Sequence, residues 1–388
     1  MIRQVYLDNN ATTRLDPQVL EAMKPFYLED FGNASSIHTL GQKARAAVEE
    51  ARRQVADLIG AQPREIVFTS GGTESDNMAI RGVATHNRSR GNHIITSTVE
   101  HPAILRTCEQ LEKEGFRVTY IPVQKDGVIR LDQLKDALDD QTILISIMHA
   151  NNEVGTIQPI QEIAALAQER KIAFHTDAVQ STGKIPLDVE ELGIDLLTLS
   201  GHKIHGPKGT GALYVRRGVR MNPLLFGGSH ERHRRAGTEN VPGIVGLGKA
   251  CDVARHGLDD FGTRMRELRD RLENGILSRI PETYVNGNRE QRMPHVTNIS
   301  FRYLEGEALL ISLDFSGIAV STGAACSSGS LEPSHVLTAI GLSSVLAHGS
   351  IRFSLSRMTT EEDIDYVLET LPATVERMRE MSPLYREG

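Results

Sequence analysis

Short apolar runs and amphipathic helical patterns alternate along much of the chain. Seven runs rich in β-branched residues predict strands, at residues 65–69, 93–97, 116–121, 142–148, 171–176, 195–200 and 211–215. Helical patterns lie between most of these runs, among them 101–113 and 159–170. Strands that alternate with helices build βαβ units. We therefore expect an α/β fold with a seven-stranded, mainly parallel sheet and helices on both faces.

Two long helical patterns frame this block. Residues 41–58 place small and branched apolar side chains on one stripe, and Gly60 is the expected stop. The pattern at 241–277 is too long for one uninterrupted helix, so we expect a break and a domain boundary near residue 256. The remaining pattern predicts a smaller α+β domain, with strands at 297–301, 318–322 and 351–355 and helices at 307–313, 333–340 and 360–381. The expected division is an extended arm at 1–15 that packs with the small domain, a large domain at 16–255 and a small domain at 256–388.

Composition and charge exclude several classes of protein. Hydrophobic residues make up 39% and charged residues 24% of the 388 residues, which is ordinary for a chain that buries its own core. The net charge of −7 argues against a nucleic-acid binder, which usually carries a basic excess. The most apolar run, 142–148, is too short to cross a membrane, and the N-terminus has no targeting pattern. The three scattered cysteines favour a reducing compartment, so we expect a soluble, cytoplasmic protein.

The sequence SGGTESD, residues 70–76, follows a predicted strand and opens a predicted helix. Paired glycines let the backbone approach a ligand closely, and Thr73 with Asp76 fits a capping box. Amide groups at a helix N-terminus bind anions. The segment therefore predicts a phosphate-binding turn, with an ordinary tight turn as the alternative.

Two further motifs follow predicted strands. In SGHKIHGPKG, residues 200–209, Lys203 is placed where a lysine of lowered pKa can form a Schiff base, and a solvated loop lysine is the alternative. In FHTDAVQ, residues 174–180, Asp177 and Gln180 are placed to contact a ring nitrogen or ribose of a cofactor, and a helix-capping aspartate is the alternative. Nucleotide-binding motifs fail here, because no GxGxxG or complete P-loop is present.

One cysteine and one arginine stand in unusual surroundings. Cys326 lies in STGAACSSGSLEPSH, where small neighbours favour an accessible, reactive thiol over a core-packing one. Cys108 and Cys251 lie in apolar helical patterns and are expected to pack in the core. Arg352 interrupts the apolar strand IRFSL. A buried arginine usually pairs with an anion, so it predicts either a substrate-carboxylate site or an internal ion pair.

Metal ligation is not indicated. His230 and His233 are three residues apart, where the metalloprotease motif requires four, and no C-x-x-C occurs. The basic cluster at 232–235 could clamp a phosphate or an acidic partner, or be solvated. A phosphate turn, a lysine, a buried acid, an arginine and a thiol together meet the needs of pyridoxal phosphate acting on an amino acid.

These segments resemble the cysteine desulfurases. The resemblance rests on YLDNNATT, SGGTESDN, VEHPA, ANNEVGT, HTDAVQ, SGHKIHGPKG, RRAGTEN, ACSSGSLEPSH and IRFSLSR, which follow the family's order over almost the whole chain. The nitrogen-fixation branch, NifS, is the nearer one. The housekeeping branch, IscS, typically reads YLDYSATTP, HVDATQ and RSGTLP at three of these places.

The resemblance implies a pyridoxal-phosphate enzyme of fold type I and a homodimer with its sites at the subunit interface. It also implies the residues that bind the cofactor: Gly72, Thr73, Ser200 and His202 at the phosphate, with Thr238 from the second subunit; Asp177 at the ring nitrogen; Gln180 at the phenolic oxygen; His101 stacked on the ring; Asn152; and Lys203 as the Schiff base. His101 would also transfer protons. Asn152 and Arg352 would hold the substrate carboxylate, and Cys326 would accept the sulfur.

The implied reaction removes sulfur from L-cysteine. L-alanine leaves, and a persulfide on Cys326 passes to an iron–sulfur scaffold protein of the NifU or IscU type, for nitrogenase or for general cluster assembly. Cys326 could share a cluster with a scaffold transiently, but this chain alone is expected to hold no metal. His205 stands where many relatives carry tyrosine, so its role is open. The alternatives are selenocysteine lyase or cysteine-sulfinate desulfinase of the same fold, or a non-catalytic sulfur carrier.

Overall fold

A seven-stranded sheet forms the centre of the larger part of the molecule. The computed structural model describes residues 3–322, 333–382 and 385. The strands of this sheet are β2 (Ile66–Thr69), β3 (His93–Ser97), β4 (Arg117–Ile121), β5 (Thr142–Ser146), β6 (Ala173–Asp177), β7 (Leu196–Ser200) and β8 (Gly211–Val215). Their order is β2-β8-β7-β6-β5-β3-β4, and β8 alone among them runs antiparallel to the other six. The predicted mainly parallel sheet is therefore confirmed.

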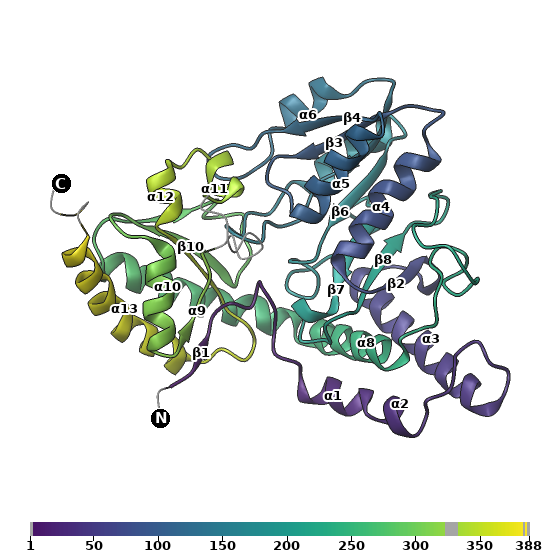
Figure 1. Ribbon diagram of the computed structural model, residues 1–388, viewed down its shortest axis with the longest axis horizontal. Helices are drawn as coiled ribbons and strands as arrows, with labels where there is room; N and C mark the ends of the chain where they lie inside the picture. Colours follow the sequence, from purple (N-terminus) through teal and green to yellow (C-terminus); the bar gives the residue numbers. More distant parts are fainter. Residues whose placement is uncertain (1–2, 323–332, 383–384, 386–388) are drawn as a thin grey trace.

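Helices cover both faces of this sheet, because successive strand residues point to opposite sides. Leu196 packs with α4 (Gly72–His86) and α5 (Pro102–Lys113), whereas Leu197 packs with α3 (Thr39–Ile59), α7 (Ile160–Glu169) and α8 (Val241–His256). Gly60 ends α3 with a left-handed φ of 69°, as its position predicted. The short helices α1 (Pro17–Met23) and α2 (Pro25–Leu28) lie against α8, and α6 (Leu131–Ala137) precedes β5 (Figure 1).

A second group of elements has a hydrophobic core of its own. Its antiparallel sheet has the order β12-β10-β9, formed by β9 (Thr283–Asn286), β10 (Val296–Phe301) and β12 (Ser350–Ser354). The helices around it are α9 (Leu258–Arg279), α10 (Gly306–Phe315), α11 (His335–Ala339), α12 (Ser344–His348) and α13 (Glu361–Met381). Figure 1 shows this group beside the larger sheet, with the N-terminal strand running along it.

The N-terminal segment joins the two groups. Strand β1 (Val5–Tyr6) pairs in parallel with β11 (Ile318–Ala319), and Val5 and Leu7 are buried in the second core. The long helical pattern at 241–277 is two helices, which meet at Gly257. The predicted break therefore occurs where it was expected. The division at residues 15 and 256 stays a prediction, for which the two separate cores are a physical reason.

Candidate active site

The carboxyl ends of several strands meet at one edge of the large sheet. Since β8 is antiparallel to both neighbours, β2 runs parallel to β7, and the segments that follow β2, β3, β5, β6 and β7 share this edge. The segments after β2, β3, β5 and β7 carry Gly72, His101, Asn152 and Lys203, and β6 itself ends at Asp177. Ligands of open α/β sheets bind at this edge. The fold thus brings together residues spread over 132 positions, from 72 to 203.

The N-terminal arm holds the loop that carries Lys203. The Lys203 ammonium donates to the carbonyl oxygens of Asn10 and Ala11, the latter at 2.9 Å. The carbonyl of His202 accepts hydrogen bonds from Thr13 N and Thr13 Oγ1, both at 2.9 Å. The sequence motifs around Lys203 gave no sign of this contribution. The nearest signal was the run of polar residues in NNATT.

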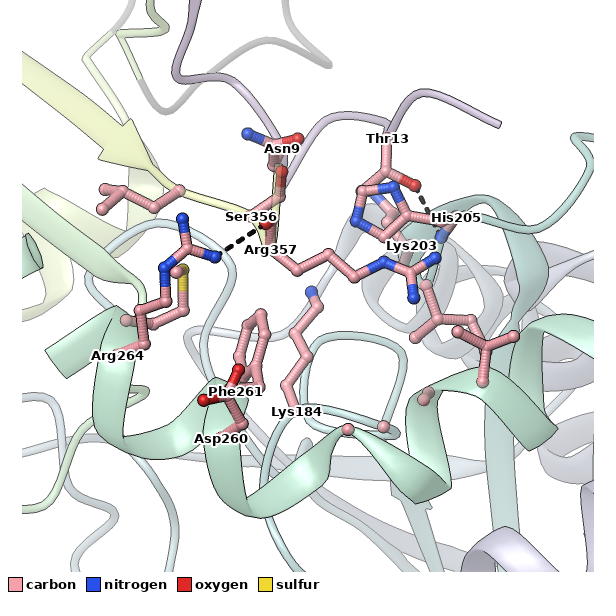
Figure 2. Close-up of a pocket in the computed structure, with 17 residues that line it drawn as sticks. Asn9, Thr13, Lys184, Lys203, His205, Asp260, Phe261, Arg264, Ser356 and Arg357 are labelled. Atoms are coloured by element: carbon pink, nitrogen blue, oxygen red, sulfur yellow. Dashed lines mark hydrogen bonds between the residues drawn. The ribbon is translucent and has the colours of Figure 1, made fainter. Parts of the chain in front are cut away.

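His205 also holds the arm against the loop that carries Lys203. Its backbone has a positive φ of 64°, its amide donates to Thr13 Oγ1 at 2.8 Å, and its Nδ1 lies 2.8 Å from the carbonyl of Arg14. Burial lowers the pKa of His205 to about 4, so the ring is neutral and Nδ1 carries the donated proton. Figure 2 shows Lys203 beside His205 and Thr13.

Asp177 is a buried carboxylate at the end of β6. Its Oδ1 accepts from the amide of Val179 at 2.9 Å, and its Oδ2 accepts no hydrogen bond from the described residues. Burial raises the pKa of Asp177, while the nearby His101 and Lys203 act in the opposite direction. Oδ1 of Asp177 thus caps the turn, while Oδ2 has no donor among the described residues. A buried carboxylate with such an oxygen suits a protonated ring nitrogen.

His101 begins α5. Its Nδ1 accepts from the amide of Ala103 at 3.1 Å, which places the proton of the neutral ring on Nε2. Burial lowers the pKa of His101, and the charge of Lys203 lowers it further, whereas Asp177 raises it. The ring is therefore neutral near pH 7 and can donate its proton from Nε2. It can take up a proton on Nδ1 only after the hydrogen bond from the Ala103 amide breaks.

The predicted phosphate turn lies at the first turn of α4. The predicted capping box of Thr73 and Asp76 is wrong, because the helix begins at Gly72 after an N-cap glycine, Gly71, with φ 150°. Thr73 is exposed, and Asp76 is buried with its Oδ1 3.7 Å from His175 Nε2. Glycine is required by the packing, since a Cβ at position 72 would lie 2.9 Å from a methyl group of Val179.

Ser200 and His202 complete this corner. Ser200 ends β7, and its Cβ would be 3.9 Å from a Cβ placed at Gly72. His202 Nδ1 lies 3.1 Å from Thr12 Oγ1, and burial lowers the pKa of His202 to about 4. The start of α4 and Ser200 therefore lie close together, and His202 follows Ser200 by two residues. A helix N-terminus, a hydroxyl and an imidazole are a donor set suited to a phosphate.

Gln180 and Asn152 are tied to the arm by hydrogen bonds. Gln180 Nε2 donates to the carbonyl of Asn10 at 3.1 Å. The carbonyl of Asn152 accepts from Asn10 Nδ2 and from Arg352 Nη1, both at 3.0 Å. Asn10 is thus a hub of the site that the sequence patterns did not single out.

Of the two possibilities predicted for Arg352, the structure shows the internal ion pair. Its Nη2 lies 2.6 Å from Asp8 Oδ1, and its side chain is buried within β12. Its Nε is buried and has no hydrogen-bond partner among the described residues. An arginine with a donor left over beside the site remains able to bind a carboxylate.

The remaining candidate features are Thr238, Cys326 and the basic cluster at 232–235. Thr238 is exposed. Cys326 lies outside the described residues. In the basic cluster, Arg235 pairs with Glu74 at 2.8 Å, so that this arginine is engaged by the first turn of α4.

The remaining sequence predictions concern cysteines, metals and membranes. Cys108 and Cys251 are buried as predicted, and burial raises the pKa of the Cys108 thiol to about 12. Within residues 3–322, 333–382 and 385, no three histidine, cysteine or acidic side chains gather as metal ligands would. Over the same described part, no helix has the length and apolar character needed to span a membrane.

Comparison with known proteins identifies the family. Residues 5–367 match the family model described as aminotransferase class-V. The chain belongs to this family. It is 56% identical over 382 residues to a cysteine desulfurase IscS of Methanosarcina thermophila, covering 98% of this chain and 94% of that one. It is equally identical, over 379 residues, to a cysteine desulfurase of a Nostoc species, with the same coverage of both chains.

Solved structures agree with the sequence relatives. A NifS-like protein superimposes with a TM-score of 0.91 at 41% identity, covering 97% of this chain and all of that one. A structure described as SspA in complex with cysteine gives a TM-score of 0.82 at 40% identity, covering 92% of this chain and all of that one. The predicted fold and the family resemblance are therefore confirmed. Since the relatives bear both IscS and NifS-like names, the nitrogen-fixation branch stays a prediction.

Proposed function

We propose that this protein is a cysteine desulfurase, which takes sulfur from L-cysteine, releases L-alanine and uses pyridoxal phosphate as its cofactor. The observation that carries this proposal is the meeting of Lys203, Asp177 and His101 at one edge of the sheet. Relatives that are 56% identical over nearly the whole chain bear that name, and one structural neighbour holds cysteine.

The residues present fit pyridoxal phosphate. The unpaired Asp177 oxygen suits its ring nitrogen, and the corner formed by Gly72, Ser200 and His202 suits its phosphate, with Thr73 in the same turn. Lys203 is the amine that would hold it covalently, Gln180 would donate to its phenolic oxygen, and His101 would stack on its ring. When bound, the cofactor supplies an electron sink that stabilises negative charge on the substrate α-carbon. Thr238 from a second subunit would complete the phosphate site.

Lys203 and His101 are the groups that would move protons. A lysine released from a covalent bond becomes a free amine, and its Nζ can take the proton from the substrate α-carbon. The carbonyl oxygens of Asn10 and Ala11 hold that Nζ in place. His101, neutral with its proton on Nε2, would serve as the second proton donor.

Arg352 would orient the substrate through its carboxylate. The charge of Asp8 fixes the guanidinium, and the carbonyl of Asn152 accepts from its other end. Because Arg352 is buried, a carboxylate that reaches it loses water and binds more strongly than one at an exposed arginine.

Cys326 would accept the sulfur. Its thiolate would attack the substrate Sγ, the Cβ–Sγ bond would break with its electron pair on the carbon side, and a persulfide would remain on Cys326. The sulfur would then pass to a scaffold protein of the NifU or IscU type.

We also propose that the protein is a cytoplasmic homodimer. Two segments present large apolar side chains to solvent, Leu28 through Ile37 and Leu225 with Phe226. Ile37 is 91% and Phe226 85% exposed, which is unfavourable unless another surface covers them. The free cysteines of the described residues are consistent with a reducing compartment.

The first test is the visible absorption spectrum of the purified protein before and after addition of L-cysteine. The expected result is a yellow absorption band that changes when cysteine is added, with release of alanine and sulfide. Lys203→Ala should abolish the band that arises from cofactor bound covalently to Lys203. A protein that stays colourless with added pyridoxal phosphate refutes the cofactor and leaves the sulfur-carrier alternative.

Two further measurements separate the remaining alternatives. A Cys326→Ser variant should retain the band but lose persulfide formation; full-rate release of alanine and sulfide from it would remove the role of Cys326. Faster turnover of L-selenocysteine or cysteine sulfinate than of L-cysteine would favour the related lyases.

A further inference from the structure

Lys184 is a buried lysine that no step of the proposed reaction uses. It is 5% exposed and lies in the loop after β6, four residues beyond Gln180. Its Nζ donates to Gln180 Oε1 at 3.4 Å. Burial lowers the pKa of Lys184 to about 7, and the charges of Lys203 and Arg352 act in the same direction. A buried amine is costly to keep, so it calls for a physical reason.

Lys184 and Lys203 border the same cavity of about 110 Å³, between the arm and the start of α9. Figure 2 shows the amine end of Lys184 pointing into this cavity, above the ring of Phe261. Much of the lining is apolar, including Met265 and Leu355. A buried amine depends on its hydrogen-bond acceptor, and among the described residues the acceptor for Lys184 is the carboxamide of Gln180.

The contact with Lys184 fixes which way the Gln180 carboxamide faces. A charged lysine only donates, so below its pKa of about 7 Lys184 requires the oxygen Oε1 on its side. Nε2 then faces the carbonyl of Asn10 at 3.1 Å, the same carbonyl that accepts from Lys203 Nζ. The reversed carboxamide would set two oxygens against each other at Asn10 and two donors against each other at Lys184.

Asn10 in turn is held from both parts of the molecule. Its amide donates to Ser354 Oγ at 2.9 Å, its Nδ2 to the carbonyl of Asn152 at 3.0 Å, and its Oδ1 lies 2.9 Å from His295 Nε2. The chain of contacts from Lys184 through Gln180 to the Asn10 carbonyl and Lys203 is therefore anchored at its centre.

We propose that Lys184 is a positioning residue that keeps the N–H groups of Gln180 turned toward Asn10 and Lys203. This inference rests on the proposed function, in which Gln180 donates to the phenolic oxygen of the cofactor. A fixed donor favours the anionic form of that oxygen, and a nearby positive charge acts in the same direction. Loss of Lys184 therefore makes a proton on the bound cofactor harder to remove.

The test is the pH dependence of the visible absorption of the reconstituted protein. In Lys184→Met the pH midpoint of the change in visible absorption should rise by about 0.5 to 1 pH unit, since the hydrogen-bond donor and the positive charge of Lys184 are both lost. Lys184→Arg, for which the adjoining cavity gives room, should restore it. Lys249→Met removes a half-exposed lysine of α8 and is the matched control, with no shift expected. Lys184 borders a second cavity besides this one. The charged or titratable groups that face Lys184 or line the first cavity are Lys203, Arg352, His202, His205, His295, Asp260, Arg264 and Arg357, and those that line the second are His149, Glu162, Asp259, Arg266, Glu290 and Arg292.

The outcomes separate this inference from the proposed function. An unchanged midpoint in folded Lys184→Met, or an equal shift in Lys249→Met, overturns the positioning role while the absorption band itself upholds the cofactor. If Lys184→Met does not fold, Lys184→Gln serves, with a smaller rise expected. If neither the unmodified protein nor any variant shows an absorption band, the proposed function fails. The inference about Lys184 is then tested without cofactor, by the pH midpoint for acylation of the Lys203 amine. This midpoint should rise in Lys184→Met, and a constant midpoint refutes the inference.

Discussion

Burial sets the charge of the side chains around Lys203. Removal from water raises the pKa of Asp177 and lowers the pKa values of His101 and His202, the latter to about 4. The site therefore holds neutral imidazoles beside a carboxyl group whose ionised form requires a cation. A protonated ring nitrogen would meet this requirement, and the low local dielectric that penalises the lone carboxylate would strengthen the pair.

At Arg352 one side chain is expected to serve both stability and substrate binding. Arg352→Lys keeps a positive charge near Asp8 but loses the fork that reaches Asp8 and Asn152 together. We expect KM for L-cysteine to rise about tenfold, or about 1.4 kcal/mol, with a smaller change in kcat. Steady-state kinetics over a range of cysteine concentrations measure the split.

The matched variant at this ion pair is Asp8→Asn, which leaves Arg352 in place. It should lower thermal stability, because one partner of a largely buried pair is removed, but KM should not rise, since Arg352 keeps more of its charge for the substrate. Should Arg352→Lys bind cysteine as well as the unmodified protein does, the ion pair alone explains this arginine.

At the scale of elements, the sequence predicted the sheet well because its signal is local. All seven strands of the large sheet occur within about two residues of their apolar runs. Strand β9 was missed, since it is an edge strand of which only one of four residues is buried, and it lacks an apolar run. The helix start at Gly72 was misplaced because a glycine with φ 150° takes the N-cap position without any side-chain signal.

The site was predictable where it follows strand ends and hidden where the arm supplies it. Asp177 ends β6, and Lys203 and the Gly72 turn come shortly after β7 and β2. The bonds from Lys203 to Asn10 and from Arg352 to Asp8 join residues 193 and 344 positions apart, and no local pattern encodes such pairs. Burial of Lys184 was equally invisible, because a lysine in a loop is ordinarily solvated.

The contact between β8 and the turn before α4 gives a prediction at this scale. A Cβ at Gly211 would lie 2.7 Å from Gly71 Cα and 2.7 Å from the carbonyl of Leu199, which are backbone atoms that cannot move aside. Gly211→Ala should therefore destabilise the protein by about 1–3 kcal/mol and weaken binding of pyridoxal phosphate. Denaturant unfolding and a cofactor titration measure the two effects.

Gly262 in α9 is the control for this substitution, because a Cβ there meets no atom within 4 Å. Gly262→Ala should stabilise the protein by up to about 1 kcal/mol through helix propensity. Equal effects of the two substitutions would show that the contact at Gly211 is not tight.

For the molecule as a whole, buried histidines make stability depend on pH. Burial lowers the pKa of His149 to about 4 and that of His175 to about 3. Since the unfolded chain titrates near 6.5, it takes up protons between pH 6.5 and 4 that the folded protein does not, and stability is lost as pH falls through this range. The opposite shift at Glu100, whose pKa burial raises to about 8, removes stability as pH rises toward 8.

The buried histidines should consequently lower the melting temperature from pH 6.5 to 4, and the extra proton of Glu100 should offset part of this fall. The dependence of the free energy of unfolding on pH should be weaker in His149→Gln, by up to about 1.4 kcal/mol per pH unit. It should be unchanged in His256→Gln, where the ring is largely exposed on α8. Scanning calorimetry at several pH values measures this. The same pH dependence in His149→Gln as in the unmodified protein would contradict the assignment of a neutral buried ring to His149.

The apolar segments Leu28–Ile37 and 225–226 give the last prediction, which concerns assembly. If a second copy covers them, charge placed at their most exposed members must be desolvated on association, at a cost of several kcal/mol. Ile37→Glu and Phe226→Glu should therefore shift the mass of the protein in solution from two chains toward one. They should also weaken cofactor binding, because Thr238 of the proposed site would come from the second subunit. Phe315→Glu is the control, since Phe315 is 79% exposed on α10 in the other group of elements and should leave the mass unchanged. Light scattering measures the mass, and loss of the dimer in Phe315→Glu alone would place the interface on the smaller part of the molecule instead.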